Sequence, residues 1–166
     1  LPNPFDDPLI PHIPVLPMSS FTIRVYGLLV HNGGVVVADE FIKGQRITKF
    51  PGGGLEFGEG LKDCLIREIR EEMGVAVLDP VHFYTTDFFQ QSAFHSTPMQ
   101  VVSVYYTFRV PEPSAIPVVS VPFGDLAGPQ DQEVFRWLPL GAVRVDAVSL
   151  PIDRVVLGML AGVNSY

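Results

Sequence analysis

Several kinds of residue and segment are scarce in this chain, and each shortage excludes a class of protein. A single cysteine, Cys64, excludes an internal disulfide and a cysteine-rich zinc site. The 11 basic residues are outnumbered by 18 acidic ones, which excludes a basic surface for holding nucleic acid by its phosphates. No apolar run approaches the roughly 20 residues that span a bilayer, and the first residues do not resemble a signal peptide. We therefore expect a soluble, cytoplasmic protein whose partners include neither a nucleic-acid polymer nor a membrane.

The residues that are present fit one folded domain preceded by an arm. A chain of 166 residues with 47% hydrophobic residues can bury a core of its own. Residues 1–17 hold six of the 16 prolines, which disfavour helices and remove strand donors. We therefore expect a Pro-rich N-terminal arm over residues 1–17 and a single domain over residues 18–166. The arm is interpreted either as an upstream extension or as a segment that packs on its own domain or on a second copy in a homodimer.

Periodicity and turn signals predict the order of the elements. The strands are expected at residues 21–30, 34–39, 82–89, 100–110 and 134–138. An Asn-Gly pair between the first two strands indicates a hairpin. The helices are expected at residues 61–73 and near the C-terminus, with Ser149 as N-cap, Pro151 in the first turn and Gly162 as the stop. The five-proline segment 111–130 is interpreted as a long loop. This order predicts an α/β (α+β) sandwich with a mixed β-sheet.

The predicted helix at residues 61–73 carries an unusual concentration of acid. Glu68, Glu71 and Glu72 lie on one arc, at the boundary of the apolar stripe. Repulsion between glutamates three or four positions apart costs about 0.2–0.5 kcal/mol per pair. The acids also lie at the C-terminal end, where the helix dipole disfavours anions. Either a hard divalent cation such as Mg²⁺ or Mn²⁺ or the neighbouring lysine and arginine side chains must offset this charge.

A glycine-rich loop precedes this helix. Glycines at positions 52–54 and 58 allow a close backbone approach to a ligand, and Glu59 adds a carboxylate. The loop is neither a dinucleotide fingerprint nor a P-loop, because G-x-G-x-x-G is absent and no Lys-Ser/Thr follows Gly58. A bare phosphate would be repelled here, whereas a phosphate bridged by cations would not.

The loop and helix together resemble the Nudix box, G-x5-E-x7-R-E-U-x-E-E-x-G-U, in which U is a bulky aliphatic residue. The chain matches every fixed position: Gly53, Glu59, Arg67, Glu68, Ile69, Glu71, Glu72, Gly74 and Val75. The resemblance implies a Nudix-type α/β/α sandwich. It also implies Mg²⁺- or Mn²⁺-dependent hydrolysis of a pyrophosphate bond in a nucleoside diphosphate linked to another moiety, of the NTP, nucleotide-sugar or ADP-ribose class.

The same resemblance implies roles for the residues of the box. Glu68, Glu71, Glu72 and the Gly53 carbonyl would be metal ligands, with Glu59 as an accessory acid. Arg67 would brace the carboxylates rather than touch the substrate.

Hydrolysis also needs a base that takes a proton from the attacking water. Relatives in the family take it from the box, here Glu68 or Glu71, or from an acid outside it. The outside candidates are Asp131 and Glu133, which follow the Pro-rich loop. Glu133 is the first choice, because the strand expected directly after it should fix its position.

The sequence gives fewer signals for the identity of the substrate than for the metal ligands. Arg24, Arg46 and Lys49 precede the box and are interpreted either as phosphate contacts or as surface charges. The proline or tyrosine that marks some subgroups about 16 residues past the box is absent, since that region reads Gln90-Gln91-Ser92. The alternative to a hydrolase is a Nudix-fold nucleotide-binding or sensor module without turnover, and the intact box favours the hydrolase.

Overall fold

Seven strands and two helices make up the described part of the chain. The computed structural model describes residues 20–92, 97–124, 126 and 133–162, so the predicted arm lies outside the described residues. The strands are β1 (Ser20–His31), β2 (Gly34–Ile42), β3 (Gln45–Lys49), β4 (Gly52–Gly54), β5 (Leu78–Thr85), β6 (Met99–Arg109) and β7 (Glu133–Pro139). The helices are α1 (Leu61–Met73) and α2 (Pro151–Ala161), with short 3₁₀ turns η1 (Pro113–Ala115) and η2 (Val145–Ala147). Neither helix is long and apolar enough to cross a membrane, as far as the described residues go.

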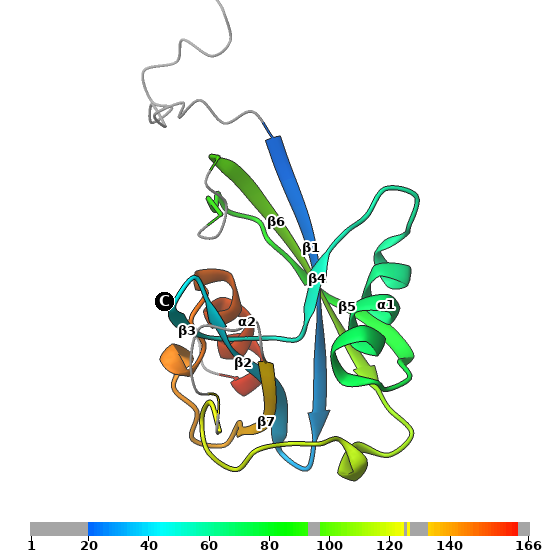
Figure 1. Ribbon diagram of the computed structural model, residues 1–166, viewed down its shortest axis with the longest axis vertical. Coiled ribbons are helices and arrows are strands. Elements are labelled where there is room, and N and C mark those ends of the chain that lie inside the picture. Colours follow the sequence, from blue (N-terminus) through cyan, green and yellow to red (C-terminus); the bar gives the residue numbers. More distant parts are fainter. Residues whose placement is uncertain (1–19, 93–96, 125, 127–132, 163–166) are drawn as a thin grey trace, which may run out of the picture.

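Strand β1 is the centre of a mixed sheet. It pairs parallel with β6, from Ser20↔Met99 to Leu29↔Phe108, and antiparallel with β4 and β2. The strand order is β3-β2-β1-β6-β5, with β4 added to β1 and β7 to β2. Figure 1 shows the strands diverging from β1 into two groups, one with β5 and β6 and the other with β2, β3 and β7.

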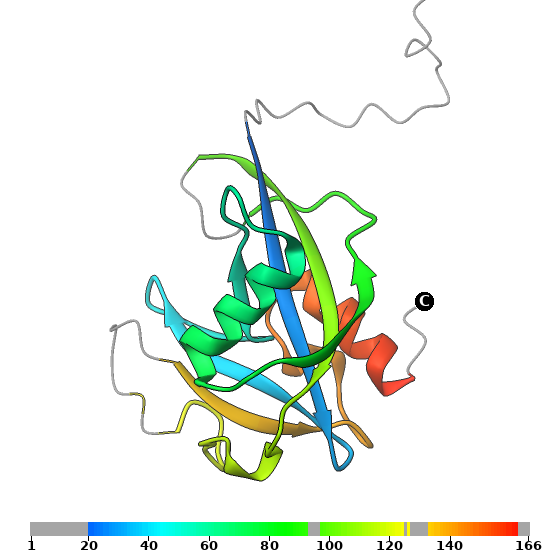
Figure 2. The ribbon, with the colours of Figure 1, turned by 90° about the vertical axis from the view of Figure 1, so that its right-hand side faces the viewer.

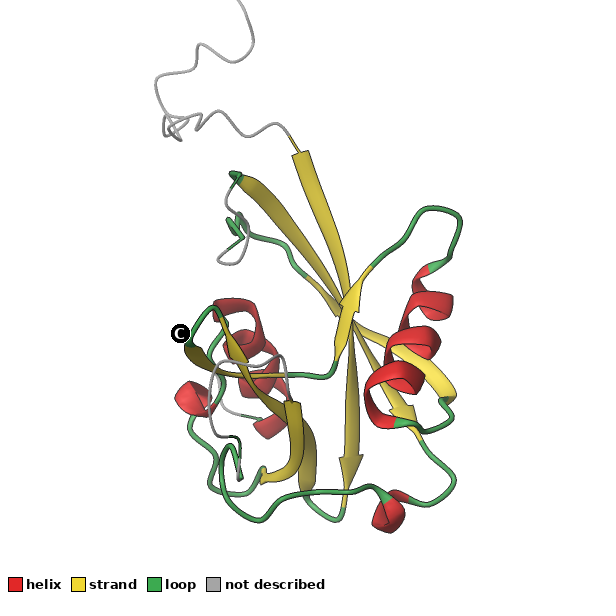
Figure 3. Cartoon of the chain, viewed as in Figure 1, coloured by secondary structure: helices red, strands yellow, loops and turns green. Residues whose placement is uncertain are grey.

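The two helices cover opposite faces of this sheet (Figure 3). Alternate side chains of a strand point to opposite faces, so Tyr106 and Phe108 pack on the α1 side and Tyr105 on the α2 side. Gly27 of β1 makes room for α1, because a Cβ there would lie 2.6 Å from the Phe108 ring and 3.1 Å from Ile69. The predicted α/β sandwich with a mixed sheet is confirmed.

Local signals account for most of the turns and helix ends. Asn32 and Gly33 have positive φ, as the predicted hairpin between β1 and β2 requires. Helix α2 has Pro151 in its first turn and ends at Gly162, which is left-handed with φ of 66°. The predicted N-cap is wrong: Leu150 occupies that position, and Ser149 Oγ instead accepts the Thr48 N–H at 2.9 Å.

Three features of the sheet differ from the sequence-based expectation. Strand β3 was not predicted, because its outer half is exposed and polar. Strand β4 is three glycines, which pair with Arg24–Tyr26 through backbone alone and carry no side-chain pattern. Strand β5 lies at Leu78–Thr85 rather than at 82–89, and its pairing with β6 is interrupted on both sides of Val81 and His82. Such an irregular, largely exposed strand shows little alternation in sequence.

A buried aspartate joins α2 to the sheet. Asp153 has no exposed surface, and its Oδ1 accepts the Tyr105 hydroxyl at 2.6 Å while Oδ2 accepts the Phe50 N–H at 3.3 Å. Burial raises the pKa of Asp153 from its ordinary 3.8 to about 6, against the lowering effect of these hydrogen bonds.

This pKa predicts a pH-dependent difference between the wild type and Asp153→Asn. A raised carboxyl pKa gives stability that is complete below pH 3.8 and is lost as pH rises through 6. Between pH 3.5 and pH 7 we expect the free energy of unfolding of the wild type to fall, relative to the variant, by on the order of 3 kcal/mol. Denaturant unfolding across this range measures it, and parallel pH profiles would contradict it.

Candidate functional site

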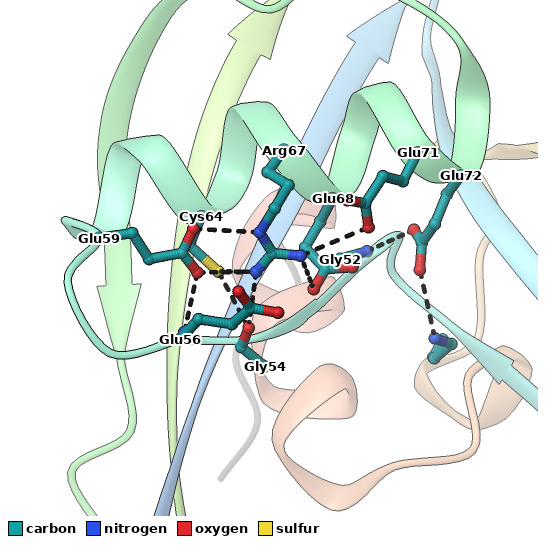
Figure 4. Close-up of polar contacts among 10 residues, drawn as sticks. Gly52, Gly54, Glu56, Glu59, Cys64, Arg67, Glu68, Glu71 and Glu72 are labelled. Carbon is teal, nitrogen blue, oxygen red and sulfur yellow. Dashed lines mark hydrogen bonds and ion pairs between the residues drawn. The ribbon is translucent and has the colours of Figure 1, made fainter.

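Arg67 joins α1 to the glycine-rich loop through several hydrogen bonds (Figure 4). Its Nη2 and Nε donate to the two carboxylate oxygens of Glu59 at 2.7 and 3.1 Å. Nη1 donates to Glu68 Oε1 at 2.8 Å and to Glu71 Oε2 at 3.4 Å, and Nη2 also donates to the Gly54 carbonyl. The hydrogen bonds from Arg67 lower the pKa of Glu59 to about 2. Arg67 therefore folds back over the loop.

The three box glutamates differ in exposure. The side chains of Glu68 and Glu72 are 14% and 16% exposed, whereas that of Glu71 is 60% exposed. Glu68 lies directly over Gly53, where a Cβ would be 2.3 Å from the carboxylate carbon. The expected boundary position holds for Glu68 and Glu72, and Glu71 lies further round the helix toward solvent.

Glu72 points away from Arg67 and toward the sheet (Figure 4). Its Oε2 accepts the Gly52 N–H at 2.8 Å, and its Oε1 lies 3.9 Å from Lys49 Nζ. Burial raises the pKa of Glu72 to about 8, although Lys49 opposes the shift.

Lys49 is itself almost fully buried and lies 3.5 Å from Glu40. Burial disfavours its charge, but the carboxylates of Glu72 and Glu40 raise the pKa of Lys49.

Glu133 completes this second group of charges. It is the first residue of β7 and stands opposite Glu40 of β2 in the strand register. Its Oε2 is buried without a hydrogen-bond partner among the described residues, and burial raises the pKa of the Glu133 carboxyl. Lys49 and Glu72 both interact electrostatically with Glu133. We call Lys49, Glu40, Glu72 and Glu133 the Lys49 cluster. Asp131, the other outside candidate, lies outside the described residues.

Sequence reasoning missed Glu40 in this cluster. Its position depends on the pairing of β2 with β7, which joins residues that lie almost a hundred positions apart. The sequence of β2 alone does not show which residue of β7 lies opposite Glu40.

The three basic residues predicted to contact substrate lie in different surroundings. Arg24 Nε donates to the Tyr26 hydroxyl at 2.7 Å, and the guanidinium interacts electrostatically with Glu68 and Glu72. Lys49 is part of the Lys49 cluster. Arg46 stacks on Phe41 and Phe123, 5.6 and 5.1 Å from the two ring centres. The structure thus brings Arg24 and Lys49 to the acids and places Arg46 on an aromatic pair.

A pocket opens next to Arg24, between the sheet and the start of α2; we call it the α2 pocket. Its volume is about 460 Å³, including the part open to solvent. It is lined by Arg24, Tyr26, Gln90, Gln91, Ser92, Val101, Ser103, Tyr105, Leu150, Pro151 and Ile152. Aromatic and aliphatic walls with a few amide and hydroxyl groups suit a flat ring with a polar edge.

The donor set suits a hard divalent cation. Within the described residues, no three acid, histidine or cysteine side chains are already gathered as a metal site. Arg67 and Lys49 instead contact the glutamates that would supply the oxygens. However, the available donors are carboxylate oxygens, which Mg²⁺ and Mn²⁺ prefer. Glu133 Oε2 has no hydrogen-bond partner among the described residues, and burial raises the pKa of Glu72, so a positive charge placed nearby would favour its ionised form.

The contact between Gly53 and Glu68 predicts the result of a matched pair of substitutions. Gly53→Ala should displace the Glu68 carboxylate and lower turnover with Mg²⁺ by at least about tenfold. Gly54→Ala is the control, because nothing lies within 4 Å of a Cβ at that position and both substitutions replace a strand glycine. Equal kinetics for the two variants would contradict the prediction.

Comparison with known proteins places this geometry in a family. The sequence profile of the NUDIX domain matches residues 21–156. No functionally curated protein matches the chain significantly.

Several solved structures share the fold. A MutT NUDIX hydrolase from Burkholderia pseudomallei is 16% identical with a TM-score of 0.60, over 84% of this chain and 96% of that one. A NUDIX hydrolase from Nitrosomonas europaea is 18% identical with a TM-score of 0.59, over 88% and 97%. A mutator MutT protein from Bacillus halodurans is 14% identical with a TM-score of 0.54, over 85% and 82%. At these identities the likeness concerns the fold alone, and the sequence profile carries the assignment. The chain belongs to the NUDIX domain family, as its box predicted.

Proposed function

We propose that the chain is a divalent-metal-dependent pyrophosphohydrolase that cleaves a nucleoside diphosphate linked to another moiety. The observation that carries the proposal is the meeting of acids from two distant parts of the chain. Glu68 and Glu72 of α1 interact electrostatically with Glu133 of β7, whose Oε2 is buried and has no partner among the described residues. Lys49 is one cation among the three carboxylates of the Lys49 cluster, so a further positive charge would favour their ionised forms.

The residues that would hold this cation are Glu68, Glu71, Glu72 and the Gly53 carbonyl, with Glu59 as an accessory acid. A bound Mg²⁺ or Mn²⁺ would neutralise phosphate charge and lower the pKa of a coordinated water. The hydrogen bonds of Arg67 to Glu59 and Glu68 keep the loop and helix at a fixed separation, so Arg67 acts as a positioning residue.

Glu133 is the proposed base. Its backbone is fixed by the ladder between β7 and β2, and burial raises the pKa of its carboxyl, which makes it a better proton acceptor than an exposed glutamate. Glu68, Glu71 and Asp131 remain the alternative bases.

The α2 pocket is the proposed site of the nucleoside. Arg24 stands at its rim and interacts with Glu68 and Glu72, so it is placed to contact a phosphate between the pocket and the acids. Arg46 and Lys49 are the weaker candidates, because Arg46 stacks on Phe41 and Phe123 while Lys49 is held by Glu40 and Glu72. The partner is a small nucleotide-type molecule in the cytoplasm.

A substrate panel tests the proposal. NTPs, ADP-ribose, nucleotide sugars and dinucleoside polyphosphates are incubated with Mg²⁺ or Mn²⁺, and release of phosphate or nucleoside monophosphate is measured. We expect cleavage that stops in excess EDTA. Tight nucleotide binding with no product from any compound would favour the alternative, a binding or sensor module. Product formation that continues in EDTA would refute the metal dependence.

A further inference from the structure

A second hollow includes two members of the Lys49 cluster, Glu72 and Glu133. It runs between the C-terminal end of α1, the start of β7 and the segment after η1, and we call it the β7 groove. Figure 2 shows how α1, β7 and this segment are arranged. Its volume is about 590 Å³, including the part open to solvent. The groove is lined by Glu72, Met73, Pro117, Val118, Val119, Glu133, Val134 and Phe135.

One wall of this groove is fixed to the sheet. The Val119 N–H donates to the Phe135 carbonyl at 2.8 Å, so the segment lies along β7 as an extra backbone partner. Ile116, three residues earlier, is buried in the core on the α1 side. Val118, between these two anchors, is 42% exposed in the groove, which leaves apolar surface free for a ligand.

The chemistry of the groove changes along its length. At one end are Glu72 and Glu133, the two acids that also belong to the Lys49 cluster. The rest of the lining is aliphatic or aromatic, and no lysine, arginine or histidine is among the described lining residues. Beyond these two acids the described lining offers a phosphate chain no cationic or polar side chain, whereas an uncharged apolar group would cover Val118 and Val119 favourably.

Arg24 of the α2 pocket relates that pocket to the acids of the groove. The two hollows share no lining residue. Arg24, at the rim of the α2 pocket, interacts electrostatically with Glu72, and Glu72 lines the groove. A pyrophosphate held between Arg24 and the acids would therefore direct one of its substituents into each hollow.

We propose that the β7 groove binds the second moiety of the substrate, and that this moiety is uncharged and mainly apolar, such as an aromatic or aliphatic alcohol esterified to the diphosphate. The inference rests on the proposed function, which supplies the nucleoside diphosphate. It distinguishes this chain's substrate from a nucleoside triphosphate, whose terminal phosphates would have to extend along the apolar lining of the groove.

A binding experiment with matched esters tests the groove separately from turnover. The probes are adenosine and uridine diphosphates whose terminal phosphate carries either a benzyl group or glycerol. A methylene group replaces the bridging oxygen, so that no probe is hydrolysed. We expect the benzyl ester to bind at least tenfold more tightly than the glycerol ester by calorimetry with Mg²⁺, in one or both nucleoside series.

Two variants test whether the preference for the benzyl ester arises in the β7 groove. Val118→Asp puts a charge in the groove and should bring the ratio of the two affinities close to one. Val121→Asp is the control, because Val121 is 56% exposed in the same segment and does not line the groove. Equal binding of the two esters to the wild type, absence of binding of any ester, or equal effects of the two variants would overturn the inference. A selective groove in a protein that releases no product from the substrate panel would instead refute the proposed turnover and leave the groove assignment standing.

Discussion

Glu72→Gln is expected to lower turnover with Mg²⁺ by about 100-fold or more without destabilising the metal-free protein at high pH. The loss follows because a neutral amide is a poor ligand for a hard cation. Glutamine retains an oxygen to accept the Gly52 N–H that Glu72 Oε2 now accepts at 2.8 Å. Turnover is measured with Mg²⁺, and unfolding is measured in EDTA.

The pH dependence of unfolding gives this prediction a second readout. Burial raises the pKa of Glu72 from 4.5 to about 8, so its contribution to stability is complete below pH 4.5 and is lost as pH rises through 8. In EDTA, the melting temperature of the variant relative to wild type should therefore rise between pH 5 and pH 9. Glu71→Gln, at an exposed position, should lower turnover as well. Wild-type turnover in Glu72→Gln would remove the acidic helix from the proposed mechanism.

Glu133→Gln is expected to lower kcat by roughly 10²- to 10⁴-fold, the range typical of the loss of a general base. Its affinity for Mg²⁺ or Mn²⁺ should stay close to that of the wild type, because the proposed ligands belong to the box. The measurement combines kcat under saturating substrate with calorimetric titration of the metal.

Two further variants show whether the effect belongs to Glu133 itself. Glu40→Gln removes the carboxylate that stands opposite Glu133 in the same ladder and should change kcat by less than about tenfold. Asp131→Asn should also have a much smaller effect than Glu133→Gln. A larger effect at Asp131 would make Asp131 the base, and near-normal rates for all three variants would place the base at Glu68 or Glu71. A large loss of metal affinity in Glu133→Gln would make Glu133 a ligand.

Local sequence signals predicted the parts of the fold that depend on neighbouring residues. Helix α1, the Asn32-Gly33 hairpin and the stop at Gly162 follow from periodicity and from residues that tolerate positive φ. The spacing of the box also predicted the family. These features need no knowledge of which distant segments come together.

The features that escaped prediction depend on pairing between distant segments. Strand β4 forms because β1 offers it backbone hydrogen-bond partners. Ser149 does not cap α2, because its Oγ accepts the N–H of the distant Thr48. In the site, the spacing of the box says nothing of Lys49 reaching Glu72 from β3. Physical reasoning on the sequence therefore names most of the candidate acidic and basic residues but not the contact between Lys49 and Glu72.

The short passage of the chain from β3 to β4 has a mechanical consequence for the site. Two residues separate Lys49, at the end of β3, from Gly52, at the start of β4. Lys49 Nζ lies 3.9 Å from Glu72 Oε1, and the Gly52 N–H donates to Glu72 Oε2, so one short segment contacts both oxygens of this carboxylate. Strand β4 is itself paired with β1, along the edge opposite β6. A substitution that shifts the end of β3 is therefore expected to rotate the Glu72 carboxylate, because it moves one contact while β1 keeps the other in place.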